Sequence, residues 1–356
     1  EADSMDIQDP ALFTPQCRVF IDGVQIKNSA EMIESVTVRL SVSEMANSCE
    51  IAIFCDYDHD KSTVGGIIAT ASPGKKVKVD LGYRYPKTVF VGYINSTGVS
   101  FSQDGVNLSL SCLDARGLLM GNTSREGFEN KSVSQIVNEL LKPVRSYTEG
   151  ITVTVPGAAD KEYPISQFEM DDYRFICLLA RITGCSFFMD GTVLKFVKDV
   201  YSSATLQGKF QWGRDVISFE RQVELSDQVG KIRVMGRSPD TLEDFFAEVS
   251  PVSGKGKNGA ALCSPVRGKV REVVSKTIKS QNEARIYAEA LMRQSCLKLC
   301  RGSAEVLGDE SIKPGKKVMF GGLDPKLNGT YYVTSVTHSF NSGGFLTNIG
   351  FCSPTD

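Results

Sequence analysis

The strongest constraint in this sequence is a five-residue segment that occurs twice, each time before the same run of strands and turns. Pro-Gly-Lys-Lys-Val begins at Pro73 and again at Pro314. Long strands then end at Phe101 and at Phe340, and the spacing between these phenylalanines is only two positions shorter than the spacing between the prolines. Returning strands are then predicted over 106–112 and 345–351. A unit repeated at so constant a spacing predicts two copies of one β module, over 73–112 and 314–352.

The segments before the first copy alternate between apolar and polar residues. Residues 17–21 and 24–26 flank an Asp22-Gly23 turn, and residues 36–40 and 49–54 repeat the same pattern. A period of two, interrupted by Asp-Gly turns, indicates antiparallel hairpins with one buried face. The first hundred residues are therefore predicted to be β structure with almost no helix.

Between the two copies the spacing of apolar residues changes to that of helices. Apolar residues recur at helical spacing from Val133 to Leu141, after a capping-box pair of Ser132 and Gln135. A second helix is predicted over 171–183 and ends at Gly184, and a hairpin is predicted around Asp190-Gly191. Residues of about 120–200 are therefore predicted to form a small α/β unit.

The rest of the chain returns to strands, predicted over 212–219 and 231–235, and adds a third helix from Ser280, with Glu283 three residues later. Together these patterns predict a mainly β chain with an α/β insertion. The predicted domains are a first β domain over 11–118, the α/β insertion over 119–205, and a second β domain over 206–356 that carries a loop at 252–259 and a helix at 280–300.

The composition excludes several classes of protein. The 356 residues include 40 basic and 42 acidic side chains, a net charge of −2, so no field favours nucleic acid or a membrane surface. The most apolar run, Phe175 to Ile182, is short and contains Arg181, so it does not predict a transmembrane helix. The polar start from Glu1 to Met5 predicts no secretory signal. The ten cysteines lack Cys-x-x-Cys pairs and are predicted to be free thiols in a reducing compartment.

Two segments match ligand-binding patterns in part. Gly254 to Gly259 reads Gly-x-Gly-x-x-Gly, but Pro251 precedes it and no helix is predicted after it, so we expect a flexible loop rather than a cofactor site. Asp56, Asp58 and Asp60 have the spacing of calcium ligands. That match fails because Lys61 and Ile67 replace the required Gly and Glu, so we expect a solvated acidic turn.

The two histidines do not indicate a catalytic or zinc site. Zinc sites need clustered Cys and His ligands, and His59 and His338 are far apart in the sequence. His338 lies in an alternating strand, where we expect a partnered structural residue, and His59 lies in the acidic turn. A carboxylate pair of the glycosidase type stays open, although no acid lies in an apolar setting that would raise its pKa. We therefore predict no enzyme activity, no catalytic residue, no cofactor and no metal.

Several segments resemble the late control gene D proteins of contractile phages, the family that includes the N-terminal hub region of type VI secretion spike proteins. Lys131 to Val137 resembles that family's Lys-Thr-Val-x-x-Ile segment. Residues 171–180, with Phe175 and Ala180, and the glycine, aromatic strand and turn over 184–194 resemble the helix and hairpin that follow it. The run from Pro314 to Phe340 is typical of the family's C-terminal part.

This resemblance implies a structural baseplate hub that joins a trimeric central spike to a hexameric inner tail tube. Each chain is then expected to contribute two tube-protein-like β-barrels to a homotrimeric ring with pseudo-sixfold symmetry. The implied partners are the tail-tube protein, the spike and other baseplate proteins, without specific nucleic acid or membrane insertion. Because the sequence stops at Asp356 without a needle, the spike is expected to be a separate protein.

The implied location is the baseplate of a virion or tail-like particle that is assembled in the bacterial cytoplasm. Two alternatives stay open at this point: a tail-associated cell-wall hydrolase, and a receptor- or glycan-binding tail module.

Overall fold

A computed structural model describes most of the chain. The described residues are 14–26, 31–42, 45–64, 66–103, 105–123, 127–157, 159–160, 162, 165–167, 169–199, 201, 203–238, 241–251, 256–275 and 278–356. The segment from Glu1 to Met5 and the loop residues 252–255, for which the sequence makes predictions, lie outside them.

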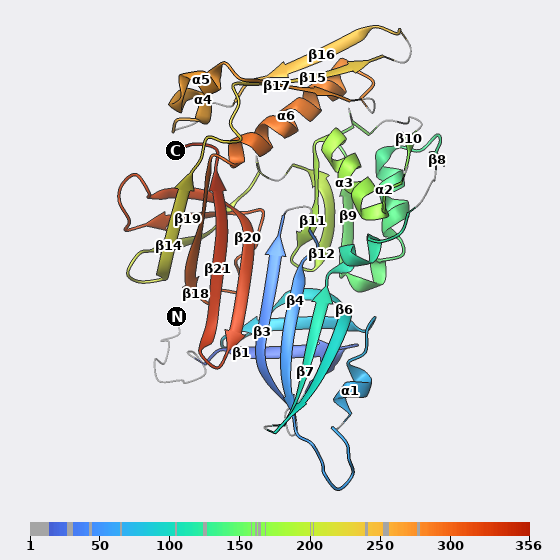
Figure 1. Ribbon diagram of the computed structural model, residues 1–356, viewed down its shortest axis with the longest axis vertical. Coiled ribbons are helices and arrows are strands. Elements are labelled where there is room, and N and C mark those ends of the chain that lie inside the picture. Colours follow the sequence, from blue (N-terminus) through green and yellow to red (C-terminus); the bar gives the residue numbers. More distant parts are fainter. Residues whose placement is uncertain are drawn as a thin grey trace, which may run out of the picture.

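Two similar sets of strands form the main sheet of the molecule (Figure 1). Module 1 consists of β1 (Gln16–Ile21), β2 (Val24–Gln25), β3 (Glu31–Ser41), β4 (Ser48–Cys55), β5 (Lys76–Gly82), β6 (Lys87–Ser102) and β7 (Gly105–Leu113). Module 2 consists of β13 (Leu206–Gln211), β14 (Val216–Val223), β18 (Cys300–Leu307), β19 (Lys317–Gly321), β20 (Gly329–Asn341) and β21 (Gly344–Ser353). The mainly β prediction is confirmed, and α1 (Ile67–Thr70) is the one α-helix of the described part of module 1.

The two modules share one sheet. Across the described residues thirteen strands join in the order β14-β18-β21-β20-β3-β4-β7-β6-β5-β1-β2, with β19 and β13 attached beside β20. In Figure 1 this sheet runs from β14 on the left to β6 on the right. Its inward residues form one core that continues from module to module: Val36 and Val38 of β3 and Val336 of β20 are fully buried. The apolar face of the alternating pattern therefore holds the modules together.

The predicted repeat is present as two meanders with the same hydrogen bonds at their start. The amide of Gly74 donates to the carbonyl of Ile94 at 2.8 Å, and the amide of Gly315 donates to the carbonyl of Val333 at 2.9 Å. Gly74 and Gly315 have φ angles of 87° and 83°, a region that favours glycine. The second residue of the repeated segment thus makes the same left-handed turn into β5 and into β19.

A first α/β unit follows β7 and packs above module 1 in Figure 1. Its helices lie where the apolar spacing predicts them, Ser132 and Gln135 form the predicted capping box, and Gly184 ends α3 with a left-handed φ of 66°. Asp190 ends β11 and the hairpin turn follows it. Its elements are η2 (Ala115–Leu119), β8 (Gly127–Phe128), α2 (Val133–Leu141), η3 (Arg145–Tyr147), β9 (Gly150–Thr154), β10 (Ile165–Ser166), α3 (Asp172–Thr183), β11 (Cys185–Asp190) and β12 (Val193–Lys198).

A second α/β unit is inserted between β14 and β18, within the residues 206–356 that were predicted as one β domain. Its elements are β15 (Lys231–Arg237), β16 (Asp244–Val249), α4 (Gly259–Leu262), α5 (Ser264–Arg267), β17 (Val270–Val274) and α6 (Gln281–Leu297). Helix α6 covers one face of the three strands through Ala284, Ala288 and Leu291. None of the helices in the described part of the chain is long and apolar enough to cross a membrane.

One predicted strand is wrong. Residues 212–219 do not form a single strand, because β13 ends at Gln211 and the chain turns at Gly213, whose φ is 81°. Strand β14 then starts at Val216. Glycine adopts this left-handed backbone conformation without strain, so the chain can turn there between the two strands.

Candidate functional site: two open sheet edges

His338 is a structural residue of β20. Its ring is fully buried, and Nδ1 lies 3.0 Å from Oγ1 of Thr347 on the neighbouring strand. Burial lowers the pKa of His338 to about 4, against the opposing influence of Asp309 and of the Ile312 backbone. A neutral, enclosed imidazole has no access to a substrate, which agrees with the structural role predicted from the sequence.

The acidic turn around Asp58 uses its carboxylate internally. Oδ1 of Asp58 accepts hydrogen bonds from the amides of Asp60 and Lys61 at 3.0 and 3.1 Å, and Lys61 Nζ lies 3.1 Å from Oδ2. The Lys61 amide, its ammonium group and the Asp60 amide hold the pKa of Asp58 below its usual value. His59 packs edge-on against the ring of Tyr57. These contacts make an ordinary capped turn.

The Gly-x-Gly-x-x-Gly segment does lead into a helix, so the expectation that none follows is wrong. Helix α4 begins at Gly259, and Oδ1 of Asn258 accepts a hydrogen bond from the amide of Ala261 at 2.9 Å. An asparagine before a Gly-Ala-Ala-Leu run is a helix-start signal, and this signal in the sequence could have predicted the helix. The helix has only four residues, and Gly254 lies outside the described residues.

A cleft of about 560 Å³ lies where α3, α6 and β20 meet. Asp199 is the single acid among its described lining residues, and its carboxylate lies 3.1 Å from the guanidinium of Arg293. A glycosidase needs two carboxylates across the scissile bond, so this cleft does not supply that pair. The structure also places no group of three or more His, Cys, Asp or Glu side chains to hold a metal within the described residues, and none of the ten cysteines forms a disulfide there.

The feature that stands out is the joint between the two modules. Strand β20 pairs antiparallel with β3, with Ser335 opposite Ser41 and Phe340 opposite Val36. The C-terminal half of β20 therefore lies between β21 and β3, and its residues from Val336 to Phe340 are buried or half-buried. This pairing joins segments near opposite ends of the chain, and nothing in the local sequence pattern predicts it.

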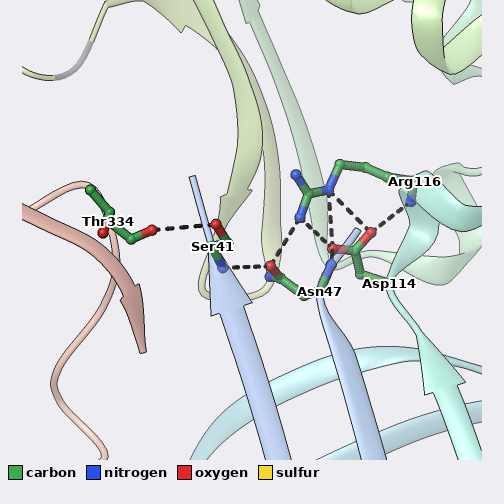
Figure 2. Close-up of polar contacts among 5 residues, drawn as sticks. All are labelled: Ser41, Asn47, Asp114, Arg116 and Thr334. Atoms are coloured by element: carbon green, nitrogen blue, oxygen red, sulfur yellow. Dashed lines mark hydrogen bonds and ion pairs between the residues drawn. The ribbon is translucent and has the colours of Figure 1, made fainter. Parts of the chain in front are cut away.

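A buried polar cluster closes one end of this joint (Figure 2). Oδ2 of Asp114 accepts from the Arg116 guanidinium and the Asn47 amide, each at 2.7 Å. Oδ1 of Asn47 accepts from Nη2 of Arg116 at 3.0 Å and from the amide of Ser41 at 2.9 Å. The hydroxyl of Ser41 and the amide of Val42 both donate to the carbonyl of Thr334 in β20. The cluster thus links both modules to the start of the first α/β unit.

The charge in this cluster is balanced inside the protein. Arg116 and Asp114 are 0% and 1% exposed. Burial alone would disfavour the guanidinium cation, but the charge and hydrogen bonds of Asp114 outweigh it and raise the pKa of Arg116. A buried pair of this kind fixes geometry more than it adds stability. The sequence carries no signal for it, because Asn47 and Arg116 become neighbours only through the pairing of β4 with β7.

The modules correspond strand by strand, which identifies two open edges. Strand β6 corresponds to β20, because each breaks register with the next strand at one place, between Ile94 and Ser96 in β6 and between Val333 and Ser335 in β20. The spacing from Ile94 to Val333 equals the spacing from Phe101 to Phe340. Strand β3 likewise corresponds to β14, with breaks between Ile33 and Ser35 and between Val216 and Ser218.

These correspondences show that β6 and β14 each lack a neighbouring strand that the equivalent strand of the other module has. The half of β6 after residue 95 pairs with β7 alone among the described strands, whereas the same half of β20 also pairs with β3. Strand β14 pairs with β18 alone in the described part of the chain, whereas β3 pairs with β4 and with β20. Open edges of this length are templates for further strand pairing, so we take them as the candidate functional site.

Comparisons with known proteins extend these findings. No curated protein matches this chain. Solved structures that share its fold include the following three. The 43 kDa tail protein of prophage MuSo2 from Shewanella oneidensis has a TM-score of 0.71 at 16% identity, over 96% of this chain and 99% of that chain. The tail protein from Neisseria meningitidis MC58 has a TM-score of 0.71 at 12% identity, over 96% and 97%.

The third is the E. coli c3393 protein, described as a component of the type VI secretion system with structural similarity to T4 bacteriophage tail proteins gp27 and gp5. It has a TM-score of 0.60 at 16% identity, over 94% of this chain and 76% of that chain. At these identities the likeness is one of fold: a mainly β chain with few helices, shared with tail and type VI proteins.

The family model that matches differs from the late control gene D family that the sequence segments resemble. It is the model described as the Alg8 N-terminal domain, and it matches residues 13–342. Because this match spans most of the sequence, the chain belongs to the family of the Alg8 N-terminal domain.

Proposed function

We propose that this chain is the structural baseplate hub of a contractile tail or injection system, where it joins a trimeric central spike to a hexameric inner tube. The observation that carries the proposal is the duplicated module. One chain contains two copies of the same strand arrangement, down to the register breaks at Ile94 and Val333. A threefold body built from such chains offers six similar surfaces to a sixfold tube.

In this proposal the two modules correspond to the two tube-like barrels that the sequence resemblance implies. In the proposed ring, three copies of the chain surround a channel, and the module faces turned away from the core line it. Strands β3 and β4 carry Thr37, Arg39 and Glu50 on that face, where Arg39 and Glu50 form a 2.9 Å ion pair. A polar face with balanced charge suits a passage through which cargo slides. The two α/β units then lie outside the ring.

Shared folds with phage tail proteins and with a type VI secretion component support this proposal. Its partners are two further copies of the chain, the tail-tube protein, the spike and other baseplate proteins, and its location is the baseplate of the particle. The proposed role requires no enzyme activity of this chain, and in the described cleft Asp199 is paired with Arg293.

The test is the composition and symmetry of the assembled particle. Tail-like particles would be purified from the source bacterium, and the copy number of this chain per particle measured by quantitative mass spectrometry and by electron cryomicroscopy. We expect three copies in a ring between the spike and the first tube ring. One copy, six copies, or no copy in the particle would overturn the proposal, and wall cleavage in a zymogram would favour the hydrolase instead.

A further inference from the structure

The joint between the modules predicts how one copy of the chain pairs with the next. Inside the chain, residues 335–340 of β20 pair antiparallel with residues 36–41 of β3. Counted from the matching register breaks, the corresponding segments are residues 96–101 of β6 and 219–224 at the end of β14. Those two segments lie along the open edges, one on each side of the joint between β20 and β3 in the strand order.

The two correspondences are independently consistent. Ala52 pairs with Ser35 and Ser109, and Glu305 pairs with Ser218 and Asn348. These pairings make Ser109 of β7 the counterpart of Asn348 of β21, without any use of β6 or β20. The spacing between Ser109 and Asn348 in the sequence equals the spacing between Ile94 and Val333, so the two routes give the same correspondence. The correspondence therefore extends across four strands of each module, and it ends at β1 and β13, which pair in opposite directions with β5 and β19.

We infer that residues 96–101 of one copy add to residues 219–224 of a second copy as an antiparallel pair, in the register of the internal joint. Ser335 opposite Ser41 becomes Ser96 opposite Glu224 of the next copy. Phe340 opposite Val36 becomes Phe101 opposite Phe219 of the next copy. The contact is head to tail, the type of contact from which closed rings are built when the rotation between copies closes.

The exposure of the two edges fits this occupant. Residues 95–102 of β6 are all exposed, whereas the same half of β20 is buried or half-buried against β3. Val99 is 43% exposed and Val223 is 40% exposed, whereas their counterparts His338 and Leu40 are 0% and 6% exposed. Phe101 is 64% exposed. Pairing would cover apolar side chains and backbone groups that otherwise face water.

The one charged residue on the inward face of this pair is already neutralised. Arg221 corresponds to the buried Val38 and would lie opposite Val99 of the neighbouring copy. Its guanidinium lies 2.7 Å from the carboxylate of Asp356 and donates from Nε to Sγ of Cys300. Covering the edge therefore does not bury an unpaired charge.

The test is a disulfide between two positions that cannot meet within one chain. Ser100 corresponds to Ser339 and Glu220 to Thr37, which are opposite each other in the internal joint. Directly opposed residues have Cα atoms about 4.5–5.5 Å apart, within the range of a disulfide. Diagonal neighbours lie about 7–8 Å apart, beyond that range. The double variant S100C/E220C should therefore link, and S100C/Q222C should not.

The full-length chain with each double variant, and each single variant, would be oxidised at high protein concentration and in assembled particles, then run on non-reducing gels. We expect S100C/E220C to give linked dimers and trimers, at least about tenfold more than S100C/Q222C or the single variants. Stronger linking in S100C/Q222C, or equal linking in all variants, overturns the register. No linking in either double variant overturns the strand pairing.

The inference rests on the proposed hub role only for the number of chains in the ring. Different experimental results would overturn the interface and the hub role. A three-copy ring in the particle without the S100C/E220C link leaves the hub role intact and removes this interface. The link in a chain that is absent from tail particles keeps the interface and removes the hub role.

Discussion

Asp114 and Arg116 form an ion pair of 2.7 Å in which both side chains are almost fully buried. The pair lies where module 1, module 2 and the first α/β unit meet, because Asn47 connects it to Ser41, and Ser41 bonds to Thr334. Its strength therefore bears on how firmly the parts of the chain are held together.

Removing one partner of this pair should be costly. In Arg116→Met, the carboxylate of Asp114 stays buried without its cation, and we expect the free energy of unfolding to fall by about 3–5 kcal/mol. The double variant R116M/D114N should recover part of that loss, because neither charge is then left alone. Urea unfolding of the purified chain measures both.

An exposed pair provides the control for this cycle. Arg285 and Glu289 form an i,i+4 pair on the surface of α6 at 3.1 Å. Arg285→Met should change the free energy of unfolding by less than about 0.5 kcal/mol. Equal losses for Arg116→Met and Arg285→Met would contradict the structural importance assigned to the buried pair.

The repeated glycine makes a prediction of its own. Gly74 and Gly315 have left-handed φ angles of 87° and 83°. Gly74→Ala and Gly315→Ala should therefore each destabilise the chain by about 1–2 kcal/mol. Replacement by Asn, which tolerates this conformation, should cost less. Thermal unfolding of the four variants gives the comparison.

Gly157 is the matched control, since a Cβ there meets nothing within 4 Å and its φ is not in the left-handed region. Gly157→Ala should leave the midpoint unchanged or raise it slightly. A large cost at only one of the two repeated glycines would show that their turns are not equivalent.

The sequence predicted those parts of the fold that depend on local pattern. Helix α2 matches its apolar spacing from Val133 to Leu141, and the turn at Asp22-Gly23 and the turn that follows Asp190 join strands as glycine-containing turns do. The repeat was visible because the Gly74 and Gly315 turns demand the same residue type. Local signals suffice where the backbone itself imposes the requirement.

The candidate site was not predictable in the same way. The pairing of β20 with β3 joins Ser335 to Ser41, and it depends on how two finished modules meet rather than on any short pattern. The sequences of β6 and β14 alternate like those of other strands, so the pattern does not distinguish them from strands that have a neighbour on each side. Only the comparison of one module's partners with the other's shows that each edge lacks a neighbour.

The pH dependence of stability should carry the signature of His338. Burial lowers its folded pKa to about 4, while the unfolded side chain titrates near 6.5. Between these values the unfolded chain binds the extra proton, so stability falls as pH drops through this window. The loss should be about 2 kcal/mol at pH 5 relative to pH 8.

The measurement is urea unfolding from pH 4.5 to 8 for the native chain and for H338V/T347V, which removes both the ring and its hydroxyl partner. The double variant should lose most of the slope between pH 5 and 7. His59, which lies in an exposed turn against Tyr57, supplies the control, and His59→Gln should keep the slope. An unchanged slope in H338V/T347V would show that another group dominates this window.

Charge placed on an open edge should separate assembly from folding. Val223 is 40% exposed on β14, so Val223→Lys should leave the unfolding midpoint of the isolated chain nearly unchanged. In the proposed ring the same lysine is covered by β6 of the next copy without a partner, so assembly should fall roughly tenfold or more. Sedimentation of the chain and its incorporation into particles report the assembly.

Two further substitutions make this result interpretable. Val274 is 75% exposed on β17, away from the open edges of β6 and β14, and Val274→Lys should affect neither folding nor assembly. Val336, at the internal joint, is fully buried, and Val336→Lys should unfold or strongly destabilise the chain itself. If Val223→Lys and Val274→Lys assemble equally well, the edge of β14 does not meet another copy. If Val223→Lys alone blocks assembly while the chain stays folded, the contact that completes the sheet lies between chains.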